Sequence, residues 1–316
     1  MKDKIKVGVI GVGYLGQHHA RILSSIKGVD LETIVDIDKK RGESIAKQYN
    51  AKFVRDYREL KNIDAVSVAI PTESHFEVAS YFLKNRIDVL VEKPITNNLE
   101  QASNLVKTAE KNGCILQVGH VERFNGAVLE LKKYVKNPLF IEIHRLSSFP
   151  QRAIDVGVVL DIMIHDLDIV LYLVKSEIKK IQAYGAKVLT DKEDIANVRL
   201  EFENGCIANI TASRISWEVQ RRLRIFEKDS YFSLDYKNQT LYRFKFPAKM
   251  KKCGIPAQQD IEVISVPVQK NEPLRLELEN FIYAVRKRKK TEVSGEEGRD
   301  VLHLALKILS CIKTNR

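Results

Sequence analysis

The chain has 316 residues and is basic, with 52 Lys and Arg against 41 Asp and Glu and a formal charge of +11. Hydrophobic residues make up 44% and charged residues 29%, which is typical of a folded globular protein and excludes a disordered chain. This length favours two domains. The charge is spread along the sequence, so we expect small anionic ligands rather than a nucleic-acid or membrane surface.

The four cysteines lack the spacing of a metal site or a disulfide framework: they are Cys114, Cys206, Cys253 and Cys311. We therefore expect no metal and a reducing compartment. The amino-terminal segment is too short for a signal peptide, and no apolar run approaches the roughly 18 residues of a membrane span. The predicted location is the cytoplasm.

Short apolar runs alternate with amphipathic segments from Ile5 to about His120. This pattern is typical of helices that cover a parallel sheet, whose strands are buried on both faces. The predicted strands are residues 6–10, 31–35, 65–69, 88–91 and 115–118. We interpret residues 1–122 as a doubly wound α/β Rossmann domain that binds a dinucleotide.

The rhythm changes after Phe124, where one long apolar helix over residues 158–174 is followed by strands that connect directly to one another. Asn204-Gly205 is a hairpin signal between two of them. The predicted strands are residues 178–187, 197–202, 206–213, 220–227, 231–236, 240–244 and 261–266, and two helices follow at 273–289 and 295–313. Residues 123–316 are thus predicted to form an α+β domain with a large, mostly antiparallel open sheet, which binds substrate and mediates oligomerisation.

The first strand leads into Gly11-Val12-Gly13-Tyr14-Leu15-Gly16, a G-x-G-x-x-G motif followed by a helix pattern. Such a turn brings backbone N–H groups to a diphosphate at a helix N-terminus. Asp36 ends the next strand, where a carboxylate binds a ribose hydroxyl and disfavours a 2′-phosphate. We expect NAD, although Lys39, Lys40 and Arg41 leave NADP open. The alternative is a glycine-rich turn without cofactor and a solvent-facing Asp36.

A second candidate site is Glu92-Lys93-Pro94, directly after the strand 88–91. Ligands bind at the carboxyl ends of parallel strands. An ammonium there stabilises a developing alkoxide, and burial lowers its pKa. The alternative interpretation is a solvated loop.

Asp161, His165 and Asp168 interrupt the apolar helix 158–174 at spacings of four and three, which predicts that they share one stripe, while Asp166 points elsewhere. Buried polar groups must satisfy one another or face a cavity. Asp161 is placed to orient and charge-stabilise His165 as a catalytic imidazole. A core histidine satisfied by two aspartates is the alternative.

Taken together, these motifs resemble the glucose-fructose oxidoreductase and inositol dehydrogenase family, Gfo/Idh/MocA. The likeness covers essentially the whole chain and includes Pro71-Thr72-x-x-His75 and Gly119-His120-x-x-Arg123-Phe124. It implies that Lys93 and His165 flank the nicotinamide ring, with Asp161 holding the imidazole. His165 removes the hydroxyl proton as hydride leaves the same carbon, and Lys93 hydrogen-bonds that oxygen; the two titrate as a coupled pair.

The resemblance also assigns binding residues. Expected cofactor contacts are Gly11, Gly13, Tyr14, Leu15, Gly16, Asp36, Ile70, Pro71, Thr72, His75, Glu92 and Lys93. Expected substrate contacts are His120, Arg123, Asn125, Arg152, Asp161 and His165. For Arg123 and Arg152 the alternative is a surface or interdomain ion pair.

Residues 118–125 and 160–168 are similar to family members that oxidise the 3-hydroxyl of UDP-N-acetylglucosamine before a transamination in making amide-linked lipid A. Those members often have proline where this chain has Gly126. Other UDP-sugars, a free sugar or an inositol are alternative substrates, and a non-catalytic NAD-binding sensor is the alternative of another class. The resemblance further implies a homodimer or homotetramer that covers the open sheet.

Overall fold

The computed structural model describes residues 4–149, 156–247 and 261–314, so Arg152 and Cys253 lie outside the described residues. The chain divides into two compact units. The first unit comprises Met1–Val121 and Glu272–Leu302, and the second comprises Glu122–Asn271 and His303–Arg316. The expected domain junction after residue 122 lies at the first of these divisions, but residues 272–302 belong to the first unit instead of the second.

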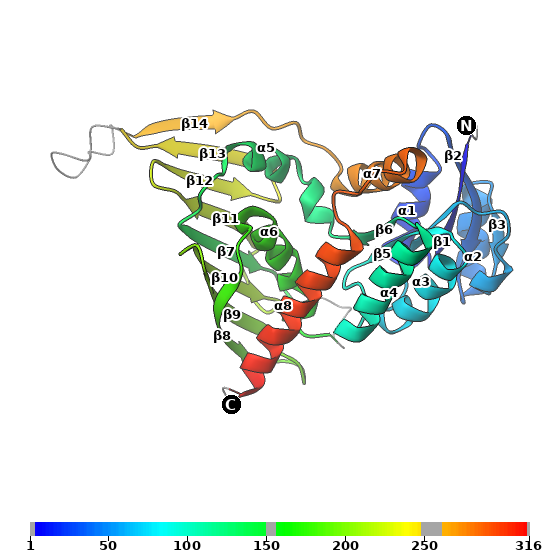
Figure 1. Cartoon of the computed structure of the whole chain (residues 1–316), viewed down its shortest axis with the longest axis horizontal. Helices are drawn as coiled ribbons and strands as arrows, with labels where there is room; N and C mark the ends of the chain where they lie inside the picture. The colour runs from blue at the N-terminus through cyan, green and yellow to red at the C-terminus, as the bar shows by residue number, and fades with distance from the viewer. Residues whose placement is uncertain (1–3, 150–155, 248–260, 315–316) are drawn as a thin grey trace. The chain divides into compact units, whose positions relative to one another are not determined.

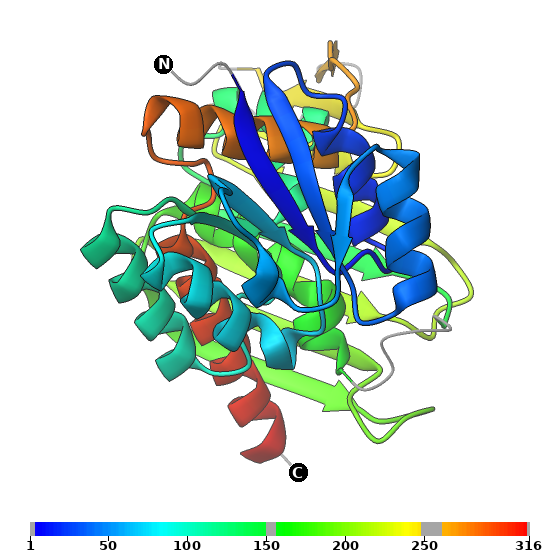
Figure 2. The same cartoon turned by 90° about the vertical axis from the view of Figure 1, so that its right-hand side faces the viewer.

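The first unit is built on a six-stranded parallel sheet of order β3-β2-β1-β4-β5-β6 (Figure 2). Its strands are β1 (Ile5–Ile10), β2 (Val29–Val35), β3 (Lys52–Val54), β4 (Ala65–Val68), β5 (Asp88–Glu92) and β6 (Leu116–Gly119). The order reverses between β1 and β4, the switch point at which doubly wound sheets bind ligands. The predicted Rossmann fold is confirmed. Only the three-residue edge strand β3 was not predicted.

Helices cover both faces of this sheet because right-handed crossovers from β1 and β4 run in opposite directions. They are α1 (Gly16–Leu23), α2 (Lys39–Gln48), α3 (His75–Lys84), α4 (Leu99–Asn112) and α7 (Pro273–Lys287). Helix α7 belongs to the first unit because it packs on α1: Leu278, Phe281 and Ile282 lie in one buried cluster with Ile22 and Leu23. Burial of a side chain such as Phe281 stabilises by about 1.5–3 kcal/mol.

The second unit contains an eight-stranded sheet of order β14-β13-β12-β11-β7-β10-β9-β8 (Figure 1). Its strands are β7 (Phe140–Leu146), β8 (Ile178–Ala186), β9 (Ile195–Phe202), β10 (Ile207–Ser213), β11 (Gln220–Phe226), β12 (Ser230–Asp235), β13 (Thr240–Lys245) and β14 (Glu262–Val266). All pairs are antiparallel except β7 with β10. The predicted mostly antiparallel sheet is confirmed, but the prediction missed β7, the strand through which both halves of the sheet are joined.

Helices α5 (Gly126–Tyr134) and α6 (Ile164–Val174) lie against one face of this sheet (Figure 1). A π-helical turn over Val159–Met163 precedes α6, so the predicted helix 158–174 does not begin as a regular α-helix. The last helix, α8 (Gly295–Thr314), begins in the first unit, and its residues from His303 belong to the second. Within the described ranges, no helix is both long and apolar enough to cross a membrane.

Candidate active site

In the turn after β1, the fold requires a glycine at two positions but not at a third. Gly11 has φ +80°, and a Cβ there would lie 2.5 Å from the Ala69 carbonyl oxygen. A Cβ at Gly16 would lie 1.8 Å from the Gly11 carbonyl oxygen, so α1 could not start so close to the turn with any other residue. A Cβ at Gly13, in contrast, would meet no atom within 4 Å. The open space beside Gly13 fits the close approach of a dinucleotide diphosphate to the backbone.

Asp36 lies at the carboxyl end of β2 and is buried. Its Oδ2 accepts hydrogen bonds from the Val12 N–H at 2.8 Å and from Arg41 Nε at 3.1 Å, and its Oδ1 accepts from Arg41 Nη2 at 2.7 Å. Burial alone would raise the pKa of this carboxyl, but the Arg41 guanidinium and the backbone N–H donors lower it below the ordinary value. Asp36 is therefore not a solvent-facing carboxylate without partners, because it forms an ion pair with the Arg41 guanidinium.

His75 links the turns that follow β4 and β5. Its ring is buried, with Nδ1 2.9 Å from the Pro94 carbonyl oxygen and Nε2 2.9 Å from the Ile70 carbonyl oxygen. Burial lowers the pKa of His75. His75 was expected to contact the cofactor, and the structure gives its ring two backbone partners within the protein. Its position ties Ile70 and Pro71 to the cis peptide between Lys93 and Pro94.

The turn after β5 contains a buried carboxylate beside a half-buried lysine, Glu92 and Lys93. Glu92 lies 3.2 Å from the ring of His19, between Oε1 and Nε2. Sequence reasoning missed His19, although its place three residues after Gly16 on α1 points it toward the sheet edge on which the glycine turn lies. His120 is buried directly after β6.

In the second unit, Asp161 lies in the π-helical turn and His165 in the first turn of α6, and both are half-buried. A π turn makes i→i+5 hydrogen bonds, and such turns are frequent at functional sites. The predicted single stripe assumed α-helical spacing throughout. The π turn breaks that assumption between Asp161 and Asp168.

Buried ion pairs anchor α6 directly after His165. Arg145 on β7 makes a bidentate pair with Asp166, at 2.8 Å from Nε and from Nη2, and its Nη1 contacts Glu122 at 2.8 Å. Arg123 pairs with Asp168 in the same bidentate manner, at 2.7 and 2.8 Å. Neither Arg145 nor a partner for Asp166 was predicted from the sequence.

Two predicted substrate residues belong to this anchoring network. Arg123 is 4% exposed, and besides pairing with Asp168 it lies over the Tyr172 ring at 3.9 Å. Asn125 is 3% exposed, and its side chain caps α5 and donates to the Tyr236 carbonyl oxygen at 3.0 Å. The alternative weighed for Arg123, a surface or interdomain ion pair, does not describe this pair, which is buried and lies within the second unit.

Gly126, the departure from the family pattern, has its own hydrogen bond. Its N–H donates to Gln239 Oε1 at 3.2 Å, a bond that proline cannot make. A Cβ at this position would lie 2.4 Å from the Gln269 carbonyl oxygen. The backbone of Gly126 is therefore in close contact with Gln239 and Gln269.

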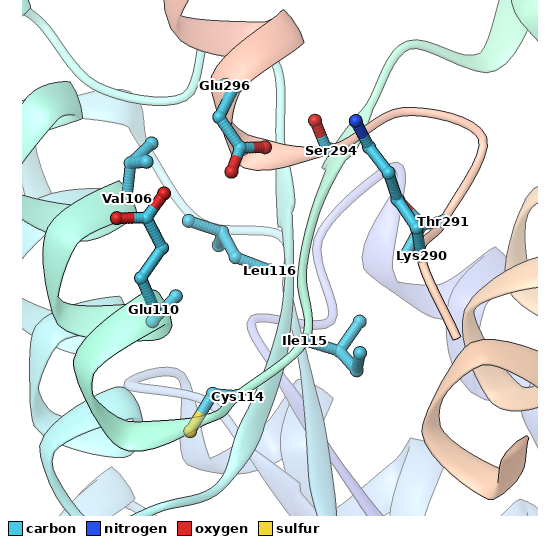
Figure 3. Close-up of a pocket in the computed structure, with 11 residues that line it drawn as sticks. Val106, Glu110, Cys114, Ile115, Leu116, Lys290, Thr291, Ser294 and Glu296 are labelled. Atoms are coloured by element: carbon cyan, nitrogen blue, oxygen red, sulfur yellow. The ribbon is translucent and has the colours of Figure 1, made fainter. Parts of the chain in front are cut away.

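A separate cavity of about 240 Å³ lies in the first unit, where α8 begins (Figure 3). Val106, Ile115 and Leu116 form an apolar part of its lining, and the carboxylates of Glu110 and Glu296 lie on one side of it (Figure 3). It shares no residue with the predicted site. Among the described residues, no group of three or more His, Cys, Asp or Glu side chains is arranged to hold a metal ion.

The parallel sheet with the glycine turn at its switch point defines a dinucleotide-binding Rossmann unit, and the similarity to known proteins makes the chain an NAD-binding oxidoreductase that acts on a CH–OH group. Residues 5–120 match the model of the oxidoreductase family with an NAD-binding Rossmann fold, and residues 125–230 match the GFO/IDH/MocA C-terminal domain. The chain belongs to the GFO/IDH/MocA family.

Similar proteins include several dehydrogenases. The chain is 35% identical to a UDP-N-acetylglucosamine 3-dehydrogenase of Acidithiobacillus ferrooxidans, over 96% of both chains. A crystal structure of the enzyme of that name from the same organism superposes with a TM-score of 0.91 and covers 98% of each chain at 32% identity. The chain is also 30% identical to a myo-inositol 2-dehydrogenase of Thermotoga maritima, over 70% of this chain and 72% of that protein.

Proposed function

We propose that this protein oxidises the 3-hydroxyl of UDP-N-acetylglucosamine with NAD and forms a UDP-3-keto sugar for a later transamination, as in lipid A or nucleotide-sugar synthesis. The observation that carries the proposal is the likeness to a UDP-N-acetylglucosamine 3-dehydrogenase over nearly the whole of both chains. The net charge of +11 supports a substrate with a diphosphate. Arg152 remains a candidate diphosphate contact.

The proposed chemistry uses Lys93, His165 and Asp161. When bound, NAD supplies the hydride acceptor. His165 takes the hydroxyl proton as the C–H bond gives up its hydride and the carbon–oxygen bond becomes a ketone. The Lys93 ammonium hydrogen-bonds the oxygen and stabilises the developing alkoxide, and Asp161 stabilises the protonated imidazole. Each general acid–base group contributes typically about 10²–10⁴-fold to the rate.

The contacts described above refine the proposed roles of the other residues. Gly13 and Asp36 keep their proposed roles toward the diphosphate and the ribose, because Gly13 faces open space and Asp36 lies beside the glycine turn through its bond to Val12. We propose that His75, Arg123 and Asn125 hold site elements in position instead of touching a ligand, because their polar groups bond to the protein and all three are buried.

A screen of substrates tests the function. Reduction of NAD is measured with UDP-N-acetylglucosamine, other UDP-sugars, free sugars and inositols, with a carbonyl reagent to trap the ketone in case oxidation is uphill. Turnover of UDP-N-acetylglucosamine with kcat/KM above the other compounds supports the proposal. A faster reaction with inositol supports that alternative, and no turnover with any compound supports a non-catalytic sensor.

Lys93→Met and His165→Asn test the catalytic roles. Loss of kcat by about 10²-fold or more is expected in both variants, because each removes a group that acts on the reacting oxygen. Lys84→Met, an exposed lysine at the end of α3, is the matched control and should retain kcat. Near-normal kcat in both site variants would refute the assignment.

We further propose that a second copy of this chain covers the outer face of the eight-stranded sheet. Four aromatic rings line that face across strands β7, β11, β12 and β13: the Phe226 and Tyr231 rings are stacked at 4.7 Å, Tyr231 and Phe244 at 4.8 Å, and Phe140 meets Phe226 edge-on. Exposed aromatic patches mark interaction sites, and a two-fold dimer pairs the same patch on both copies. Phe226→Lys should therefore shift the mass measured by light scattering from dimer or tetramer to monomer.

We assign the protein to the cytoplasm. The cysteines Cys114 and Cys206 are free thiols, which suits a reducing compartment. Burial raises the pKa of Cys114 and of Cys206 to about 11, so both thiols stay protonated at neutral pH.

A further inference from the structure

His19 is buried completely on the helix that follows the glycine turn. Its Nδ1 lies 2.7 Å from the Ser67 hydroxyl oxygen on β4, and its Nε2 lies 3.2 Å from Glu92 Oε1 at the end of β5. One side chain thus connects α1 to two neighbouring strands at the sheet edge on which the cofactor turn lies.

The Glu92 carboxylate lies where a side chain at Gly119 would otherwise be. Glu92 pairs in register with Gly119 on β6, and a Cβ at Gly119 would lie 2.8–2.9 Å from the carboxylate atoms. Glu92 is 8% exposed. A buried carboxylate is costly unless a donor or a cation faces it, and the His19 ring faces this one.

Ser67 supplies the partner of one ring nitrogen of His19, Nδ1. The other nitrogen, Nε2, is the one that faces Glu92, at an ion-pair distance of 3.2 Å. His75 differs, because both of its nitrogens face carbonyl oxygens and a neutral ring can donate to only one of them.

Glu92 precedes Lys93 in the chain, and a buried polar contact with the Glu92 carboxylate restricts the turn that carries the lysine. The orientation of a reacting group decides how much it contributes, and misplacement by about 1 Å can cost 10²-fold in rate. We propose that His19 is a positioning residue: by holding the Glu92 carboxylate, it fixes the Lys93 turn relative to the helix that receives the cofactor. This inference rests on the proposed role of Lys93 in hydride transfer.

The test compares His19→Leu with His19→Gln by steady-state kinetics and by NADH binding measured from fluorescence. His19→Leu should lower kcat by about 10²-fold, because Glu92 loses the polar contact that orients it. NADH affinity should change little, because the glycine turn is untouched. His19→Gln provides a polar group of similar reach and should recover much of the lost kcat.

A double-mutant cycle identifies Glu92 as the residue through which His19 acts. The kcat of the double variant His19→Leu/Glu92→Gln should be no lower than that of Glu92→Gln alone, because residues in direct contact are non-additive. Gln117→Leu is the matched control: it removes a buried hydrogen bond within the same unit, from the Gln117 amide to the Glu277 carbonyl oxygen, and should preserve kcat.

The outcomes separate this inference from the proposed function. If the wild-type protein oxidises no sugar or sugar nucleotide, the proposed function fails first. If the wild type is active and Lys93→Met is inactive, a normal kcat in His19→Leu, or additive losses in the cycle, overturns the positioning role. A fall in NADH affinity equal to the fall in kcat also overturns it, because that result describes general damage to the cofactor turn.

Discussion

The first unit carries its predicted site residues on turns, whereas the second carries them on a helix. In the first unit, Asp36 bonds to the backbone of Val12 and Asp38, and Gly16 packs on the Gly11 carbonyl. In the second unit, buried side-chain ion pairs anchor α6: Arg145 binds Asp166 and Arg123 binds Asp168.

This difference shows that the two parts depend on different forces. A turn is defined by φ angles and close backbone contacts, so a single methyl group can block it. The orientation of α6 depends on buried charges, whose removal leaves a partner without compensation. Variants of the two kinds should therefore fail in different ways, which the following predictions test.

The largest expected effect is in the second unit. Arg145→Met leaves Asp166 and Glu122 buried without their cation, and breaking a buried pair in this way costs about 3–5 kcal/mol. Urea unfolding measures the loss. Lys133→Met, which breaks the exposed pair with Glu130, is the control and should cost less than about 1 kcal/mol. Equal effects of the two substitutions would show that the buried network does not anchor α6.

Glycine variants of the cofactor turn should have smaller effects that differ from one another. Gly16→Ala places a methyl group against the Gly11 carbonyl, and such overpacking typically costs about 1–3 kcal/mol. Gly13→Ala meets no protein atom, so its stability should lie within about 0.5 kcal/mol of wild type while NADH binding weakens. Thermal unfolding and NADH titration of both variants measure the difference. Unchanged NADH affinity in Gly13→Ala would argue against diphosphate binding at this turn.

The smallest expected change in free energy concerns cofactor choice. Asp36→Ser removes the carboxylate that engages Arg41 and frees the guanidinium for a 2′-phosphate. We expect the ratio of NADP to NAD affinity to rise about tenfold, which corresponds to about 1.4 kcal/mol. Asp36→Ser/Arg41→Leu, which lacks the cation, should show no such rise. A wild-type preference for NADP would contradict the assignment of Asp36.

Much of the fold could be predicted because its signals are local. Buried parallel strands are short apolar runs, and the strands of the second sheet are separated by turn residues. Two strands were missed for physical reasons. The strand β3 is only three residues long, and β7 lies after the first domain, where no glycine turn or hairpin marks it, although its residues alternate between half-buried and buried.

The candidate site was predicted where residue type and position are sufficient, as for Gly11, Gly16 and Lys93. The partners of these residues could not be predicted. Nothing in the sequence near His19 indicates that its ring meets Glu92, since the two come together only when α1 packs on the sheet. The π turn before α6 was not predicted either, because its residues are those of an ordinary apolar helix.

The sequence by itself determined the class of fold, the cofactor turn and the family, because glycine, proline and buried apolar runs act over a few residues. The tertiary structure decided which polar groups meet: Arg41 with Asp36, His19 with Glu92, and the arginines that hold α6. Buried charges must find partners wherever the packed elements bring them. These partners meet only in the folded protein. For this reason we propose that Arg123 and Asn125 support the site, whereas the sequence led us to expect that they contact a ligand.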